Sequence, residues 1–118
     1  MSYQNLSVWQ ASRELVKQIY LVTADFPKSE QFGLTGQLRR AAISIPCNIA
    51  EGYGRKSARS YSQFLRIAKG SVNELETLLL ICEDLNFLAG TAGLRQDCSK
   101  IGSMLSNLER SILRTADE

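Results

Sequence analysis

Apolar residues recur at helical spacing through nearly the whole chain, and this periodicity limits the possible folds more than any other feature of the sequence. Rows of apolar side chains seven residues apart keep their register for several turns in succession. No stretch shows the strict alternation of apolar and polar residues that is typical of a β-strand. The length of 118 residues suits one domain and leaves no room for a second. The sequence therefore predicts an all-α protein in which residues 1–118 form a single domain.

Breaks between the apolar rows divide the chain into four predicted helices. They run from about Ser7 to Thr23, from a start between Glu30 and Thr35 to Tyr53, from about Ser57 to Asn86, and from a cap at Thr91 to about Arg114. At the first of these starts, Ser7 and Gln10 have the spacing of a capping box. Because short connections force neighbouring helices to run in opposite directions, we expect an antiparallel up-down-up-down four-helix bundle.

Two residues inside the predicted helices would ordinarily break them. Pro46 removes the amide that would bond to the Ala42 carbonyl, but the apolar row continues in phase beyond it. We therefore expect a kink of roughly 20° or more in the second helix, with the Asn48 side chain filling the backbone gap. Gly70 is followed by Ser71, which could cap a new helix, but the continuous phase favours one long helix.

The composition excludes several kinds of chemistry. The chain has no histidine, which excludes Ser-His-Asp and Cys-His catalysis, histidine-based zinc sites and ribonucleases that pair arginine with histidine. Cys47, Cys82 and Cys98 are odd in number and far apart, so we expect three buried thiols and no metal site. A helical enzyme of the chorismate mutase type would need charges that interrupt the apolar rows, and none does. We expect no enzyme, no cofactor and no small-molecule substrate.

The expected location follows from the hydropathy of the chain. No segment approaches the roughly 20 apolar residues that a membrane-spanning helix needs, so no membrane partner is expected. The N-terminus also lacks the basic region and apolar stretch of a secretory signal. These features predict a cytoplasmic protein.

Positive charge is concentrated in the middle of the chain. Residues 39–69 carry seven basic residues and one acid, a net charge of +6, whereas residues 70–118 carry four basic and eight acidic residues, a net charge of −4. We call the seven basic residues the basic strip: Arg39, Arg40, Arg55, Lys56, Arg59, Arg66 and Lys69. On the third predicted helix its members lie opposite the core row, close to Tyr53 and Tyr61, whose rings could stack on bases. The strip predicts contact with the phosphates of RNA or DNA.

Two other interpretations of the strip stay open. Its members could be ordinary solvated side chains on the polar side of a long helix, or they could bind an acidic protein partner. A protein-interaction scaffold without a nucleic-acid ligand is therefore the alternative function.

The helices carry more apolar surface than one subunit can bury. Residues 78–82 are all apolar, so they cover the whole circumference of the helix, and Leu80 and Ile81 must point away from the core. Burial of such surface between subunits is worth several kcal/mol per interface at roughly 25 cal/mol per Å². We therefore expect a homo-oligomer, with an interface that includes Trp9, Tyr20, Arg40, Ile43, Glu51, Leu80 and Ile81, in which Arg40 and Glu51 are candidate ion partners.

One long segment resembles a known family. The sequence QLRRAAISIPCNIAEG of residues 37–52, together with LSVW at 6–9, FPKSE at 26–30 and AKGSVNELET at 68–77, resembles the signature of the bacterial proteins encoded in intervening sequences of 23S rRNA genes. The resemblance implies an antiparallel four-helix bundle that assembles as a ring-like homopentamer. It also implies nucleic acid as the expected ligand and no established catalytic activity, so the family offers no catalytic residues to transfer to this chain.

Overall fold

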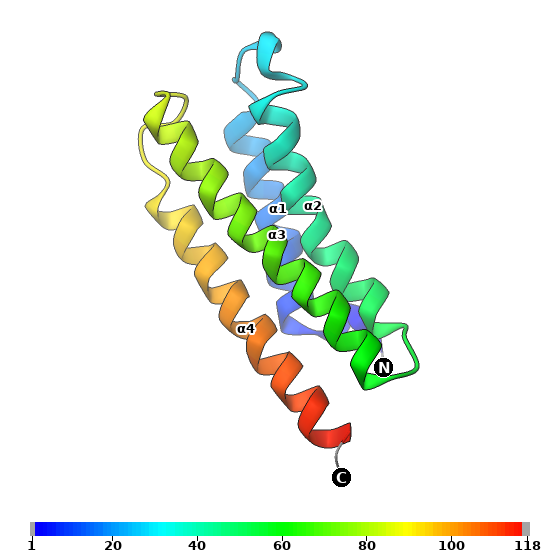
Figure 1. Ribbon diagram of the computed structural model, residues 1–118. Coiled ribbons are helices and arrows are strands. Elements are labelled where there is room, and N and C mark those ends of the chain that lie inside the picture. The colour runs from blue at the N-terminus through cyan, green and yellow to red at the C-terminus, as the bar shows by residue number, and fades with distance from the viewer. Residues whose placement is uncertain (1, 117–118) are drawn as a thin grey trace.

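The computed structural model describes residues 2–116, and four long helices packed side by side make up nearly all of this part of the chain (Figure 1). These are α1 (Ser7–Thr23), α2 (Leu34–Tyr53), α3 (Ala58–Asp84) and α4 (Ala92–Ala116), with short 3-10 turns η1 (Tyr3–Asn5) and η2 (Lys28–Glu30) before α1 and α2. Residues 2–116 contain no β-strand and extend over 51 × 21 × 20 Å. The predictions of an all-α class and of four helices are confirmed.

The start of α1 differs from the predicted capping box. Leu6 occupies the cap position in an extended conformation, and no side chain caps the helix there. The Gln10 amide donates instead to the carbonyl of Gln4, at 2.9 Å. The turn η1 brings this carbonyl beside the first turn of α1, so the pairing of Ser7 with Gln10 is wrong.

The end of α3 is fixed by a turn that has asparagine in place of the usual glycine. Asn86 has a positive φ of 64°, and the amide of Phe87 donates to the carbonyl of Cys82 at 2.8 Å. This is the Schellman arrangement, with asparagine in the left-handed position that glycine usually takes. The Phe87 ring then stacks on Phe26, with 5.4 Å between centroids, and so ties the end of α3 to the segment after α1.

The two potential breakers lie inside continuous helices. α2 runs through Pro46 to Tyr53, and α3 runs through Gly70 as one helix, as its apolar phase predicts. The side chain of Asn48 donates to the carbonyl and to the hydroxyl of Ser44, at 2.8 and 2.9 Å. It therefore does not fill the backbone gap that Pro46 leaves at Ala42, and that expectation is wrong.

One apolar core runs through the bundle, and each of the four helices contributes to it. Its fully covered members include Ile19, Leu38, Ile45, Ile49, Leu65, Leu75, Leu79, Cys98, Ile101 and Leu105. Of the three cysteines, Cys82 and Cys98 are buried, but Cys47 is exposed. Cys47 follows the core residue Ile45 by two positions, which places it on the outward side of α2, so the expectation of three buried thiols is wrong for it.

The four helices are not equally close to one another. α3 packs along both α2 and α4, whereas α1 and α4 touch over a much shorter stretch. A groove of about 610 Å³ remains between α1 and α4, and Leu15, Ile101 and Met104 are among the residues that line it. α4 is therefore held to the bundle mainly through α3. None of the helices in residues 2–116 is both long and apolar enough to cross a membrane.

Candidate nucleic-acid interface

The basic strip is divided between two places in the structure. Arg39 and Arg40 lie in the second turn of α2, whereas Arg55 and Lys56 lie in the connection that follows this helix. At 1.5 Å per residue, roughly 20 Å of helix separates the two groups. Arg59, Arg66 and Lys69 lie in the first half of α3, next to that connection. The structure therefore brings Arg55, Lys56 and Arg59 together, whereas the other four basic residues lie further along α2 or α3.

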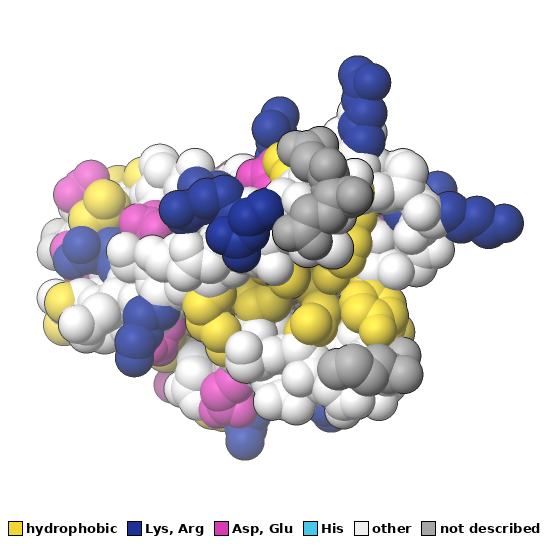
Figure 2. Space-filling view, turned by 90° about the horizontal axis from the view of Figure 1, so that it is seen from below, with side chains coloured by type: hydrophobic (Ala, Val, Ile, Leu, Met, Phe, Trp, Pro, Cys, Tyr) yellow, Lys and Arg dark blue, Asp and Glu magenta, His cyan; other side chains and the backbone are white. Residues whose placement is uncertain are grey.

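The gathered residues lie toward one end of the molecule. The α2–α3 connection lies at the lower end of Figure 1. Figure 2 looks onto that end and shows Lys and Arg side chains around its edge, with hydrophobic side chains in a hollow between them. Lys56 and Arg59 are exposed and form no ion pair with other residues of the described part of the chain.

Arg39 has a structural role that the sequence analysis did not foresee. Its side chain is half-buried, its guanidinium lies 4.3 Å from the centroid of the Tyr20 ring, and its Nε donates to the hydroxyl of Thr23 at 3.0 Å. Arg39 thus joins α2 to α1 through one of its five N–H groups and through its contact with the Tyr20 ring. Arg40, one residue later, is exposed.

Arg55 is also engaged within the subunit. It forms an ion pair with Glu51, at 2.7 Å, and its guanidinium lies 4.6 Å from the centroid of the Phe64 ring. Both partners of the ion pair are well exposed, so the pair contributes little to stability. Within this subunit Glu51 pairs with Arg55, one helical turn further along the chain, whereas the sequence analysis paired it with Arg40.

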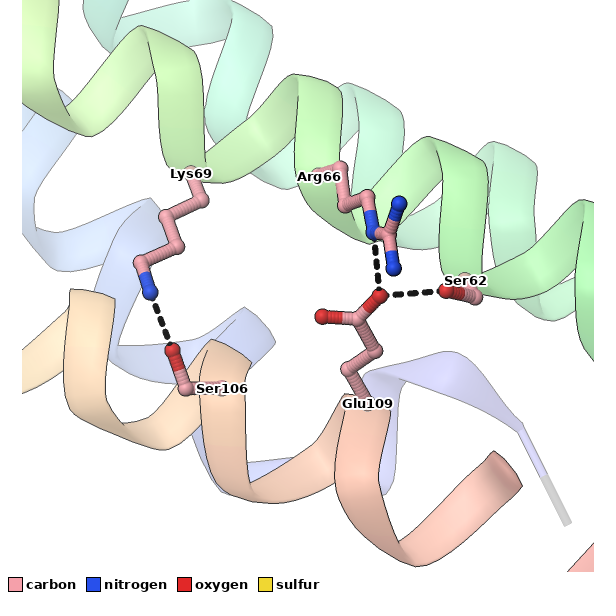
Figure 3. Close-up of polar contacts among 5 residues, drawn as sticks. All are labelled: Ser62, Arg66, Lys69, Ser106 and Glu109. Carbon is pink, nitrogen blue, oxygen red and sulfur yellow. Dashed lines mark hydrogen bonds and ion pairs between the residues drawn. The ribbon is translucent and has the colours of Figure 1, made fainter.

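The remaining two members of the strip contact α4 and form a polar seam between α3 and α4 (Figure 3). Arg66 Nε donates to a carboxylate oxygen of Glu109 at 2.6 Å, and the Ser62 hydroxyl donates to the same oxygen. Lys69 Nζ donates to the hydroxyl of Ser106 one turn along. We call these five residues the α3–α4 seam.

The seam fixes the charge state of Glu109. The bond from Ser62, followed by the bond and charge of Arg66 and the charge of Lys69, holds the pKa of the Glu109 carboxyl below its ordinary value. The Glu109 side chain is only 20% exposed, whereas that of Arg66 is 70% exposed. A single carboxylate is thus held between a buried hydroxyl and an exposed guanidinium.

The tyrosines that were expected to stack on bases pack on each other instead. The centroids of the Tyr53 and Tyr61 rings are 6.1 Å apart in an edge-on arrangement, and Tyr3 packs on Tyr53 at 6.4 Å. Burial, with a smaller contribution from Tyr53, raises the pKa of the Tyr61 hydroxyl. Both residues are half-buried.

The predicted interface residues vary in how much surface they present. Leu80, Tyr20, Ile43 and Ile81 are 44%, 40%, 38% and 36% exposed. Trp9 is half-buried, because its ring packs against Tyr3 with 5.4 Å between centroids. Arg40 and Glu51 are exposed on α2. Most of these side chains therefore remain available on the surface of one subunit.

The sequence analysis missed Glu109, Ser62 and Ser106, the partners that occupy two members of the strip. Ser62 precedes the core position Leu65 by three residues and is itself buried, so its place on the inner side of α3 could have been noticed. Glu109 follows the core residue Leu105 by four positions, so its place beside the core stripe of the fourth helix carried the same signal. Its pairing depends on how α3 and α4 align along their length, which no local pattern specifies.

Acid titration tests the seam. A carboxyl whose pKa is lower in the folded than in the unfolded state stabilises the fold above its ordinary pKa, about 4.3, and this stabilisation is lost as the pH falls through the folded-state value. We expect Glu109→Gln to lower the melting temperature at neutral pH and to flatten its decline with acid. Ser62→Ala removes the largest cause of the lowered Glu109 pKa, so it should also flatten the decline of the melting temperature with acid. The same dependence of melting temperature on pH in wild type and Glu109→Gln would contradict this account.

Comparison with known proteins gives a family match. The family model for the 23S rRNA-intervening sequence protein matches residues 4–107, which include α1, α2, α3 and most of α4. No curated protein matches the sequence. The resemblance seen in residues 6–77 is thereby confirmed over nearly the whole chain, and the chain belongs to the 23S rRNA-intervening sequence protein family.

Proposed function

We propose that this protein is a non-enzymatic, oligomeric helical bundle that binds RNA or DNA through the gathered part of its basic strip. The observation that carries the proposal is the position of Lys56 and Arg59, which are exposed beside Arg55 and Arg66 and have no ion-pair partner among residues 2–116. Clustered cations of this kind neutralise phosphates and release counterions, which favours polyanion binding whatever the base sequence.

The proposal includes finer features of the fold and of the assembly. Short connections and the packing order of the helices support an antiparallel up-down-up-down path, and the position of Pro46 within α2 supports a kink in that helix. Family membership and the exposed apolar residues support a homopentamer in the bacterial cytoplasm. In such a ring, five weak strips would act with the avidity of linked sites.

A protein-interaction scaffold is the second candidate function. It is favoured by the engagement of Arg55, Arg66 and Lys69 with protein groups inside the subunit, because the same chemistry could bind acidic groups of another protein. In that case the exposed cations would pair with a protein surface and no nucleic acid would compete for them.

Salt-titrated binding to labelled single-stranded and duplex RNA and DNA tests the function. We expect Lys56→Ala with Arg59→Ala to reduce the slope of log K against log salt concentration by roughly 1.5, because each lost phosphate contact removes about 0.7–0.9. The control is Lys28→Ala with Lys100→Ala, which removes the same charge from η2 and α4 and should leave the slope nearly unchanged. Binding that does not respond to salt, or equal slopes for the two double variants, would contradict the proposal.

A further inference from the structure

The α3–α4 seam has the composition of an anion site whose anion belongs to the protein itself. A hydroxyl from Ser62 and a guanidinium N–H from Arg66 converge on one carboxylate oxygen of Glu109, and the Lys69 ammonium lies one turn along α3, bonded to Ser106 (Figure 3). The three donors come from successive turns of the same face of α3. Glu109 alone among the five seam residues carries a negative charge.

The donors of the seam match the needs of a phosphate group as well as those of a carboxylate. Both anions accept charge-assisted hydrogen bonds from guanidinium and ammonium groups, and both accept bonds from hydroxyls. A phosphodiester and the Glu109 carboxylate would therefore compete for the same N–H and O–H groups. The exposed side of Arg66, at 70%, gives an incoming phosphate access to this position.

The surroundings of the seam can accommodate a larger anion. A groove of about 480 Å³ lies between α3 and α4, beginning at Lys69 and extending to Arg110. Asn73, Ser106 and Asn107 are among the polar residues that line it. The Arg110 guanidinium donates to the Asn107 side chain within α4, at 2.9 Å. Lys69 and Arg110 thus supply one cation from each helix, and Glu76 supplies a carboxylate. Of the five seam residues, Lys69 and Ser106 line this groove, so the seam lies at its edge.

We propose that Ser62, Arg66 and Lys69 form a binding site for a nucleic-acid phosphate at the edge of the groove between α3 and α4, and that Glu109 occupies this site as an internal competitor until a phosphate displaces it. This inference rests on the proposed nucleic-acid binding. It adds the position of one bound phosphate and assigns the Glu109 carboxylate to that position when no nucleic acid is bound.

Two glutamate variants provide a matched test. Glu109→Gln and Glu83→Gln each remove one negative charge, and each releases one arginine from an ion pair, Arg66 at 2.6 Å and Arg95 at 3.7 Å. Glu83 also accepts a hydroxyl hydrogen bond, from Thr91, as Glu109 does from Ser62. The probes are a fluorescein-labelled single-stranded RNA of 20 nucleotides and inorganic phosphate, at fixed ionic strength. We expect Glu109→Gln to raise the affinity for both probes by about fivefold, because a phosphate would no longer have to break an ion pair of ordinary strength. Glu83→Gln should raise either affinity by less than about twofold, because Arg95 lies outside the basic strip.

The outcomes separate this inference from the proposed function. Equal gains for the two variants would show that only net charge matters and would overturn the site. A gain in phosphate binding at Glu109→Gln with no RNA binding by any variant would support the site and reject nucleic acid as its ligand. Arg66→Ala added to Glu109→Gln should abolish the gain. If Glu109→Gln fails to fold by circular dichroism, Glu109→Asp replaces it, since the shorter carboxylate reaches Ser62 and Arg66 less well and should raise affinity in the same direction.

Discussion

Replacement of Leu79 by alanine is expected to lower the free energy of unfolding by about 2–5 kcal/mol, whereas the same replacement at Leu80 should cost an isolated subunit less than about 1 kcal/mol. The two leucines are neighbours in α3, but Leu79 is 0% exposed and Leu80 is 44% exposed. Removal of the Leu79 side chain therefore leaves a cavity in the core, and removal of the Leu80 side chain does not. Chemical denaturation of the two variants measures both costs.

Self-association changes the expectation for Leu80 in a way that can be measured. If copies of the chain bury the outward faces of α2 and α3 against each other, Leu80→Ala with Ile81→Ala will lower the mass measured by light scattering and will make stability depend less on protein concentration. Leu79→Ala should leave the mass unchanged under conditions where it is folded. A wild-type chain that remains a single copy at all concentrations would contradict the proposed oligomer.

The helical part of the fold could be predicted from the sequence because its cause is local. The spacing of core residues such as Leu38, Ile45 and Ile49 on one face depends only on the 3.6-residue period of the helix. The same period correctly predicts that α3 continues through Gly70. It also predicts that Leu80 and Ile81 are exposed in one subunit.

The predictions that failed depend on backbone geometry outside the helices or on contacts between them. Gln10 bonds to Gln4 rather than Ser7 because a 3-10 turn, too short to leave a periodic signal, precedes α1. The expectation for Cys47 came from the general tendency of cysteine to be buried, and its position on α2 overrides that tendency.

The candidate site was predictable as a set of charges but not as an arrangement. The sequence shows that seven basic residues occur between positions 39 and 69. It does not show that Arg39 covers Tyr20 or that Arg66 meets Glu109, 43 residues away. Such pairings arise from the way helices are aligned against one another, and this alignment is set by the packing of whole faces.

Close packing of α2 on α3 also explains a glycine that no turn requires. A Cβ atom added at Gly52 would lie 2.8 Å from the Cβ atom of Phe64 and 3.2 Å from the carbonyl oxygen of Tyr61, both on α3. A backbone carbonyl cannot rotate away as a side chain can, so relief of the clash would need a shift of one helix against the other. Gly52 therefore permits the close approach of the two helices just before the connection that carries Arg55 and Lys56.

We expect Gly52→Val to lower the free energy of unfolding by about 2–3 kcal/mol, because overpacking at a helix contact outweighs the small gain in helix propensity. The matched control is Gly70→Val, since a Cβ atom at Gly70 meets nothing within 4 Å. This replacement should change stability by less than about 0.5 kcal/mol. Denaturant melts of both variants test the packing, and equal costs at the two positions would contradict it.

A displaced α3 should also weaken RNA binding by Gly52→Val under conditions where the variant is folded, because Arg59 and Arg66 move with that helix while Arg55 and Lys56 remain with the connection.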